Sequence, residues 1–191
     1  MNRPLHAIGA IAALASTPGI GSCVPVSRRA SLADFEAALA ANDSATTTLE
    51  HWCARLDLAN PPAIHAIPMP GDDSPPAAEL LAKLDLAPGE HYRLRNVELV
   101  CGSTVLSRAR NWYVPGRLTA AMNRALETGA EPFGRVVAAT GFRRERLASR
   151  RGQSESCPPG TVLSQHARLI GADGRPISLL VECYTAAILG V

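Results

Sequence analysis

Residues 162–189 read VLSQHARLIGADGRPISLLVECYTAAIL, two segments rich in strand-forming residues with a turn between them. Ala172-Asp173-Gly174 is a strong hairpin signal between the segment from Val162 to Ile170 and the one from Ile177 to Leu189. The sequence therefore predicts an antiparallel hairpin near the C-terminus, around which the rest of the fold is arranged.

Further strands and helices precede this hairpin. Strands are predicted over residues 63–69, 90–100 and 104–114, and prolines place the first of them at a sheet edge. Helices are predicted over residues 32–41, 47–56, 77–86 and 120–128. Because the strands are joined as hairpins, without a βαβ rhythm, we expect an α+β fold: a single antiparallel sheet with helices packed on one face.

Glu182 is the one carboxylate in the last apolar segment, Pro176 to Leu189. An ionised carboxylate among apolar residues is costly unless it has a partner or keeps a proton. Burial in such a strand should raise the pKa of a glutamate, so Glu182 could serve as a proton donor. The alternative is a solvent-facing glutamate on an edge strand.

Arg95 belongs to an alternating stretch, Glu90 to Val100, in which it shares a face with Val97 and Leu99. If that face is buried, the guanidinium points into the interior and requires a planar carboxylate, which it can hold in a bidentate fork. The alternative is an arginine that reaches solvent along the sheet surface.

Composition and charge argue against nucleic-acid binding. The chain has 191 residues, long enough for one domain, a net charge of only +2 and 4% aromatic residues, which argues against nucleic acid as a partner. A basic run between Phe142 and Gln153 is expected to be a solvated face, although it could attract an anionic substrate; its arginines are Arg143, Arg144, Arg146, Arg150 and Arg151.

The chain has five cysteines, Cys23, Cys53, Cys101, Cys157 and Cys183, and no CxxC pair, so we expect no structural zinc site and no metal. If Cys23 is lipidated, an even number remains, which permits disulfides in an oxidising compartment. Their connectivity cannot be read from the sequence, and buried free thiols are an equal alternative.

The first 25 residues are typical of a targeting segment. Arg3 provides a positive start, Leu5 to Ala15 an apolar core too short to span a bilayer, and Pro18-Gly19 a break. Ile20-Gly21-Ser22-Cys23 is similar to a bacterial lipoprotein cleavage box, which would anchor a lipid on Cys23. We therefore expect a leader over residues 1–25, a domain over residues 26–191 and a periplasmic or membrane-anchored protein; the alternative is a cytoplasmic protein with an alanine-rich N-terminus.

Several segments together resemble the chorismate pyruvate-lyase family over about residues 31 to 189. They are Asp43-Ser44-Ala45-Thr46, the stretch from Tyr92 to Leu99, Tyr113-Val114-Pro115, Glu131-Pro132-Phe133-Gly134-Arg135 and Leu179-Leu180-Val181-Glu182. Each motif is weak alone, and the resemblance depends on their order and spacing. The sequence departs from the family's pattern around Ser107 to Tyr113 and between Arg144 and Pro159. The second departure leaves open which segment covers the site in this chain.

The resemblance implies a six-stranded antiparallel sheet and an enclosed site that removes pyruvate from chorismate to leave 4-hydroxybenzoate, a precursor of ubiquinone, without cofactor or metal. It implies that Arg95 binds the ring carboxylate, assisted by backbone N–H groups at Ala45 and Phe133, beside Thr46 and Gly134. Glu182 would lie at the opposite end of the ring, by the ether oxygen.

Three functions follow from these observations. The first is a chorismate lyase acting as a monomer on a small aromatic carboxylate. The second is an exported, non-catalytic protein that binds a small aromatic acid, because architecture alone does not imply catalysis. The third is a secreted structural protein in which Arg95 and Glu182 pair with each other.

Overall fold

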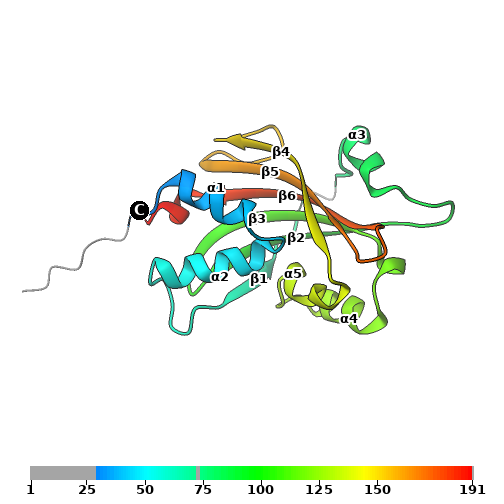
Figure 1. The fold of residues 1–191 in the computed structure, drawn as a ribbon, viewed down its shortest axis with the longest axis horizontal. Helices are drawn as coiled ribbons and strands as arrows, with labels where there is room; N and C mark the ends of the chain where they lie inside the picture. Colours follow the sequence, from blue (N-terminus) through cyan, green and yellow to red (C-terminus); the bar gives the residue numbers. More distant parts are fainter. Residues whose placement is uncertain (1–28, 72–73, 191) are drawn as a thin grey trace, which may run out of the picture.

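The computed structural model describes residues 29–71 and 74–190, so the predicted leader and Cys23 lie outside the described part of the chain. Within that part, six antiparallel strands form one sheet in the order β1-β2-β3-β6-β5-β4 (Figure 1). The strands are β1 (Ile64–Pro68), β2 (Arg93–Cys101), β3 (Thr104–Tyr113), β4 (Arg143–Arg151), β5 (Thr161–Ile170) and β6 (Pro176–Thr185). The predicted α+β fold with a single antiparallel sheet is confirmed.

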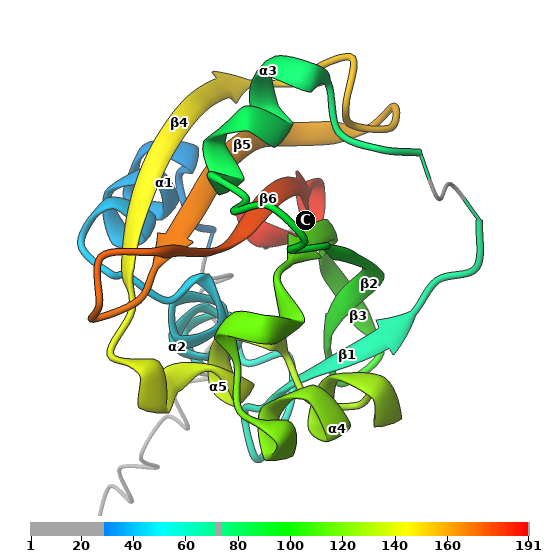
Figure 2. The same cartoon turned by 90° about the vertical axis from the view of Figure 1, so that its right-hand side faces the viewer.

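The longer helices cover one face of the sheet. The helices are α1 (Leu32–Ala40), α2 (Ala45–Arg55), α3 (Ala78–Leu81), α4 (Ala120–Thr128) and α5 (Phe133–Val136), with 3-10 turns η1 (Ala82–Leu84), η2 (Pro115–Arg117), η3 (Ala138–Thr140) and η4 (Ala186–Leu189). The helices α1 and α2 pack in one core cluster, and α4 and α5 in a second. The short α3–η1 segment lies on the other face (Figure 2). There Leu84 belongs to a third core cluster, together with Trp112 and Leu179.

The strand β6 lies in the middle of the sheet, between β3 and β5. Nine of its ten residues are buried, because helices cover one of its faces and the α3–η1 segment part of the other. This position explains the uninterrupted apolar run around Glu182, which is typical of a strand buried on both faces. The hairpin predicted before it is present, with Gly174 at a φ of 81° in its turn.

Local sequence signals fix the helix ends. The hydroxyl of Thr119 caps α4 and accepts a hydrogen bond from the backbone N–H of Met122, and Gly129 ends the helix at a φ of 93°. The helix predicted over residues 47–56 begins earlier, at Ala45, because Ser44 is its N-cap. This shift matters for the site, since it places Ala45 and Thr46 in the first turn of α2.

Two disulfides join segments that are distant in the sequence. Cys53 on α2 is bonded to Cys101 at the end of β2, and Cys157 in the loop before β5 is bonded to Cys183 on β6. Of the two alternatives that the sequence leaves open, the structure has the disulfides rather than free thiols. Within the described residues, no helix combines the length and apolar character that crossing a bilayer requires.

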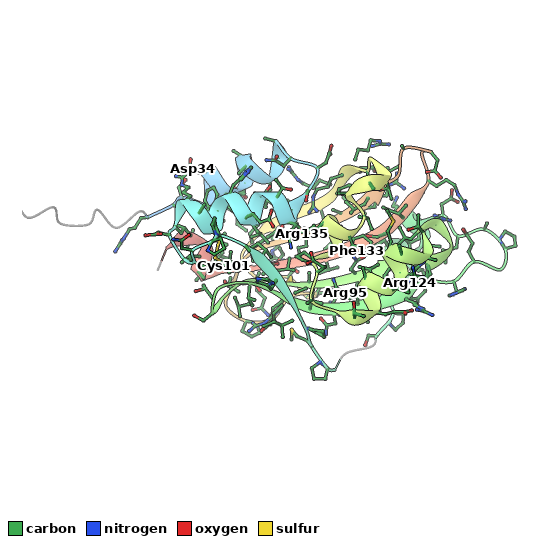
Figure 3. All side chains as sticks on the ribbon, turned by 90° about the horizontal axis from the view of Figure 1, so that it is seen from below. Asp34, Arg95, Cys101, Arg124, Phe133 and Arg135 are labelled. Atoms are coloured by element: carbon green, nitrogen blue, oxygen red, sulfur yellow. A yellow bond between two sulfur atoms is a disulfide. The ribbon has the colours of Figure 1, made fainter. Side chains whose placement is uncertain are left out.

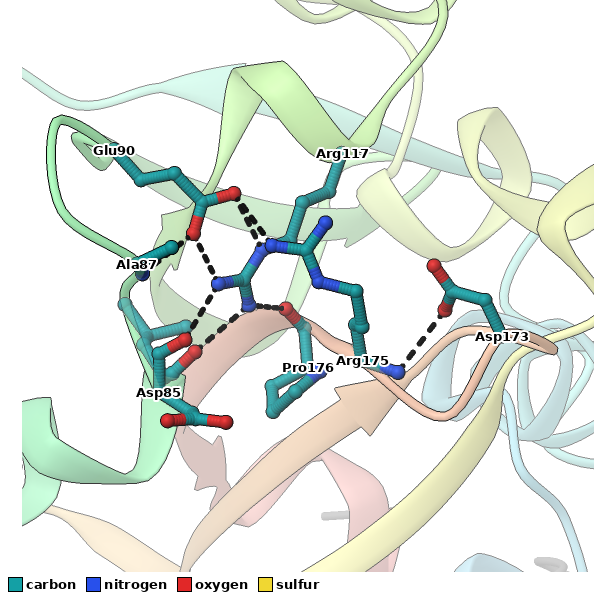
Figure 4. A network of polar contacts seen from close by, with 8 residues as sticks. Asp85, Ala87, Glu90, Arg117, Asp173, Arg175 and Pro176 are labelled. Atoms are coloured by element: carbon teal, nitrogen blue, oxygen red, sulfur yellow. Dashed lines mark hydrogen bonds and ion pairs between the residues drawn. The ribbon is translucent and has the colours of Figure 1, made fainter.

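Arg117 joins three segments at the end of the sheet opposite the disulfide Cys53–Cys101. Its side chain is only 2% exposed and forks onto the carboxylate of Glu90, which also accepts a hydrogen bond from Arg175 (Figure 4). The remaining N–H groups donate to three backbone carbonyls, those of Leu84, Asp85 and Pro176. All five donors of the guanidinium are therefore used, and the α3–η1 segment is tied to the start of β6.

We expect Arg117→Met to lower the thermal midpoint by about 8 °C, because three carbonyls lose a donor at once and Glu90 keeps only Arg175 and the backbone N–H of Ala87. Hydrogen bonds from Arg117 and from the backbone of Ala87, with the nearby charges of Arg117 and Arg175, lower the pKa of Glu90 from 4.5 to about 2. Folding lowers this pKa, so the stabilisation is complete above about pH 4.5 and is lost as the pH falls towards 2. Thermal melts at pH 7 and pH 3 measure it, with exposed Arg124→Met as the control; equal melting of both variants would contradict the prediction.

Candidate functional site

A cavity lies between the sheet and the first turns of α2 and α5. The space between its lining side chains measures about 480 Å³, a figure that includes open solvent at the mouth. All six site residues named from the sequence line this one cavity: Arg95, Glu182, Ala45, Thr46, Phe133 and Gly134. Segments separated by more than a hundred residues of chain are thus brought together at one place.

Arg95 reaches the cavity from β2, and only 8% of its surface is exposed. Its Nη2 donates to the backbone carbonyls of Gly129 (2.7 Å) and Glu131 (2.8 Å). Its Nε and Nη1 are buried and have no hydrogen-bond partner. Burial lowers the pKa of Arg95, which Tyr113 offsets only in part. The alternative of a solvent-facing arginine therefore does not hold, and the guanidinium has donors to spare for an anion.

Glu182 has a buried cationic partner, Arg144, which reaches it from β4 across β5. Arg144 Nη1 lies 3.3 Å from Glu182 Oε1, and Nη2 donates to Oε2, which also accepts a hydrogen bond from the hydroxyl of Tyr184 at 3.0 Å. Each side chain of the ion pair is 5% exposed. Burial opposes the charge of Arg144, but the carboxylate of Glu182 outweighs it and raises the pKa of Arg144.

Two expectations need correction here. Arg144 is buried and paired, not part of a solvated face, because β4 alternates and turns this one arginine inward while Arg143 points out. Glu182 is not a lone acid in an apolar strand. A guanidinium forked onto both oxygens stabilises a carboxylate rather than a carboxylic acid, so the geometry does not favour Glu182 as a proton donor.

Arg95 and Glu182 are not paired with each other. The sheet register sets Arg95 opposite Asn111, and Glu182 opposite Ala109, so β3 separates the two charged residues. Two strand spacings, with a stagger of two residues along the strands, put their Cα atoms roughly 12 Å apart across the sheet, at two ends of the cavity. The structural role in which they form one ion pair is therefore excluded in this structure.

The other four predicted residues form the roof over the sheet. Ala45 and Thr46 lie in the first turn of α2, and Phe133 and Gly134 begin α5. The ring of Phe133 packs on Tyr113 with centroids 5.7 Å apart, near the Arg95 end (Figure 3). A role for the backbone N–H groups of Ala45 and Phe133 stays a prediction.

Sequence reasoning missed Asn111 as well as Arg144. Asn111 lines the cavity beside Arg95, is 2% exposed, and has no partner for either its Oδ1 or its Nδ2. Strand alternation could have placed Asn111 on the face of Ala109, but nothing in one sequence marks Arg144 among its neighbouring arginines. Residues 29–71 and 74–190 contain no group of three or more His, Cys, Asp or Glu side chains placed to hold a metal.

Gly134→Ala tests how closely the roof is packed. A Cβ at this position would lie 2.9 Å from Thr46 Oγ1 and 3.1 Å from Ser44 Oγ, so these two side chains or the helices that carry them would have to shift. We expect the thermal midpoint to fall by about 5 °C, as for other overpacked sites. Gly116→Ala, whose Cβ meets no atom within 4 Å, is the control and should melt like the wild type. Equal midpoints for all three proteins would show that the roof is loose.

Comparison with solved structures finds distant likenesses. The chain matches YydK of Bacillus subtilis with 12% identity and a TM-score of 0.45, over 65% of this chain and 58% of that one, less than two thirds of its length. It also matches the ligand-binding domain of a GntR-family transcriptional regulator from Bordetella bronchiseptica, with 16% identity and a TM-score of 0.43, over 64% and 85% of the two chains.

Comparison by sequence finds one near relative. No protein-family model matches the chain. The uncharacterised protein y4mC of Sinorhizobium fredii is 38% identical over 187 residues, which cover 86% of this chain and 79% of that protein. The chain therefore belongs to the same family as y4mC.

Proposed function

We propose that the protein binds a small aromatic carboxylic acid in the cavity, with the carboxylate on Arg95. The observation that carries the proposal is that Nε and Nη1 of this buried guanidinium have no partner. Arginine stays charged at any physiological pH, and a buried charge without a partner is costly. A ligand carboxylate would accept a hydrogen bond from each free donor and remove that cost.

The walls of the cavity suit a flat apolar body between two polar ends. The larger apolar lining residues are Val97, Leu99, Phe133, Phe142, Leu169 and Leu180. The amide of Asn111, beside Arg95, adds a second group with unused donor and acceptor capacity. The separation of Arg95 and Glu182 by one strand fits a ring that carries polar groups at opposite positions. The resemblance to chorismate pyruvate-lyases supports the same ligand class.

We further propose that the protein works outside the cytoplasm. The disulfides Cys53–Cys101 and Cys157–Cys183 support this, since such bonds persist in oxidising compartments. The targeting pattern of residues 1–25 supports it as well, and a lipid anchor at Cys23 is part of the same proposal. Mass spectrometry of the mature protein, without reduction, measures both the cleavage site and the disulfides; an uncleaved chain with all five thiols free would contradict export.

Titration calorimetry with 4-hydroxybenzoate tests ligand binding. We expect saturable one-to-one binding, and no binding of 4-hydroxybenzyl alcohol, which has the same ring and hydroxyl but no carboxylate. Equal binding of the acid and the alcohol would contradict the role of Arg95, and binding of neither would overturn the proposal.

A chorismate lyase is the second candidate, favoured by the cavity with Arg95 and Glu182 at its two ends. Against it, the guanidinium of Arg144 forks onto both oxygens of Glu182, an arrangement that does not suit a proton donor to the leaving ether oxygen. Incubation of the protein with chorismate, followed by chromatography for 4-hydroxybenzoate and pyruvate, decides between the two. Formation of both products in equal amounts would establish the lyase.

A further inference from the structure

The buried charges around the cavity do not balance. Three ionisable side chains that line it are buried: Arg95, Arg144 and Glu182. Arg144 and Glu182 neutralise each other, and Arg95 has no counter-ion among the described residues. Asp43, which accepts a hydrogen bond from the backbone N–H of Arg144 at 2.8 Å, is exposed at the mouth, where water screens its charge. The buried side chains that line the cavity thus carry one uncompensated positive charge.

Tyr184 does not change the net charge of the buried side chains around the cavity. Burial and the neighbouring carboxylate of Glu182 raise its pKa well above 10, so it stays a neutral donor to Oε2. Gln165, which accepts a hydrogen bond from Arg144 Nη2 at 3.3 Å, is neutral as well. The network around Glu182 therefore holds one fixed anion in place with neutral and cationic donors.

Glu182 still has room for one more donor. A carboxylate has about four acceptor sites. Its Oε2 accepts from Arg144 and Tyr184, whereas Oε1 accepts only from Arg144 within the described part of the chain. A neutral hydroxyl could donate to the remaining site of Oε1. A second ligand carboxylate there would face an ionised carboxylate whose side chain is buried, where like charges repel more strongly than in water.

We infer that the cavity selects acids with a single negative charge and a neutral hydrogen-bond donor at the far end, and that Glu182 excludes dicarboxylates of the same length. The inference rests on the proposed function and names its ligand class more closely. A monoanion on Arg95 makes the cavity neutral, whereas a dianion leaves an unpaired negative charge beside Glu182. Chorismate carries two carboxylates, so the same rule disfavours it.

Titration calorimetry at pH 7.5 with 4-hydroxybenzoate and benzene-1,4-dicarboxylate tests the rule on the wild-type protein. We expect the hydroxy acid to bind at least about 100-fold more tightly, since an opposed pair of like charges costs several kcal/mol. Binding of both within threefold would overturn the charge rule but leave the proposed function standing. Failure of every benzoate to bind would overturn both.

Glu182→Gln is the matched variant, because it keeps the shape of the side chain and removes its charge. The cavity then carries two positive charges, and we expect the preference for the hydroxy acid to fall at least about 30-fold and move towards the dicarboxylate. Circular dichroism checks that the variant is folded, and the wild-type comparison decides the rule even if it is not. An unchanged preference in folded Glu182→Gln would overturn the assignment of selectivity to Glu182.

Discussion

Arg95→Met is expected to weaken the binding of 4-hydroxybenzoate by at least about 100-fold, because two hydrogen bonds from a charged donor are lost together. Methionine fills a similar volume, so the cavity keeps its apolar walls. Arg95→Lys keeps the charge but not the fork, and its affinity should fall between those of the wild type and the methionine variant. Calorimetry on the three proteins measures the order.

Arg93→Met is the control for this series. Arg93 lies on the same strand, but its side chain is 51% exposed and paired with Glu127 on α4. Its removal should leave the affinity for the acid unchanged. If Arg95→Met binds within threefold of the wild type while it remains folded, Arg95 is not the anion-binding residue and the proposed function fails.

Arg144→Met should be the most destabilising single substitution near the cavity. It leaves Glu182 buried with Tyr184 as a neutral donor and without a cation, and breaking a buried ion pair in this way costs about 3–5 kcal/mol. For a chain of this size, that corresponds to a fall in the thermal midpoint of about 10 °C. Differential scanning calorimetry measures the shift.

The double variant Arg144→Met with Glu182→Leu separates the effect of the ion pair on stability from the effect of side-chain packing at the two positions. Because both charges are removed, no unpaired ion remains, and we expect most of the lost stability to return. The double variant should nevertheless lack selectivity between hydroxy acid and dicarboxylate. A double variant that melts as low as Arg144→Met would show that packing, rather than charge, governs this end of the cavity.

The part of the fold that local patterns specify was predictable from the sequence. The hairpin around Gly174 and the helix between Thr119 and Gly129 are encoded by residues that lie next to one another in the chain. Their turn and cap chemistry depends on backbone geometry alone, so a single sequence is enough to read it.

The cavity was predictable only in part. The six named residues come together as the family resemblance implies, yet the partner of Glu182 did not follow from any local pattern. Arg144 is one arginine of a basic run, and only the pairing of β4 with β5, including a register shift between Arg146 and Ala148, decides that it turns inward. Register of this kind is set by long-range packing, and so is the choice of disulfide partners.

The disulfides also act on the denatured chain. One covalent loop, closed by Cys53 and Cys101 over 48 residues, contains Arg95; the other, closed by Cys157 and Cys183 over 26 residues, contains Glu182. Loops of these lengths reduce the entropy of the unfolded ensemble by an amount worth about 3–4 kcal/mol each. A typical domain is stable by only about 5–15 kcal/mol, so a chain that folds with reduced thiols loses much of its margin. The redox potential of the compartment in which the chain folds decides whether the two disulfides form. It thereby influences the fraction of the protein that is folded, with Arg95 and Glu182 both at the cavity.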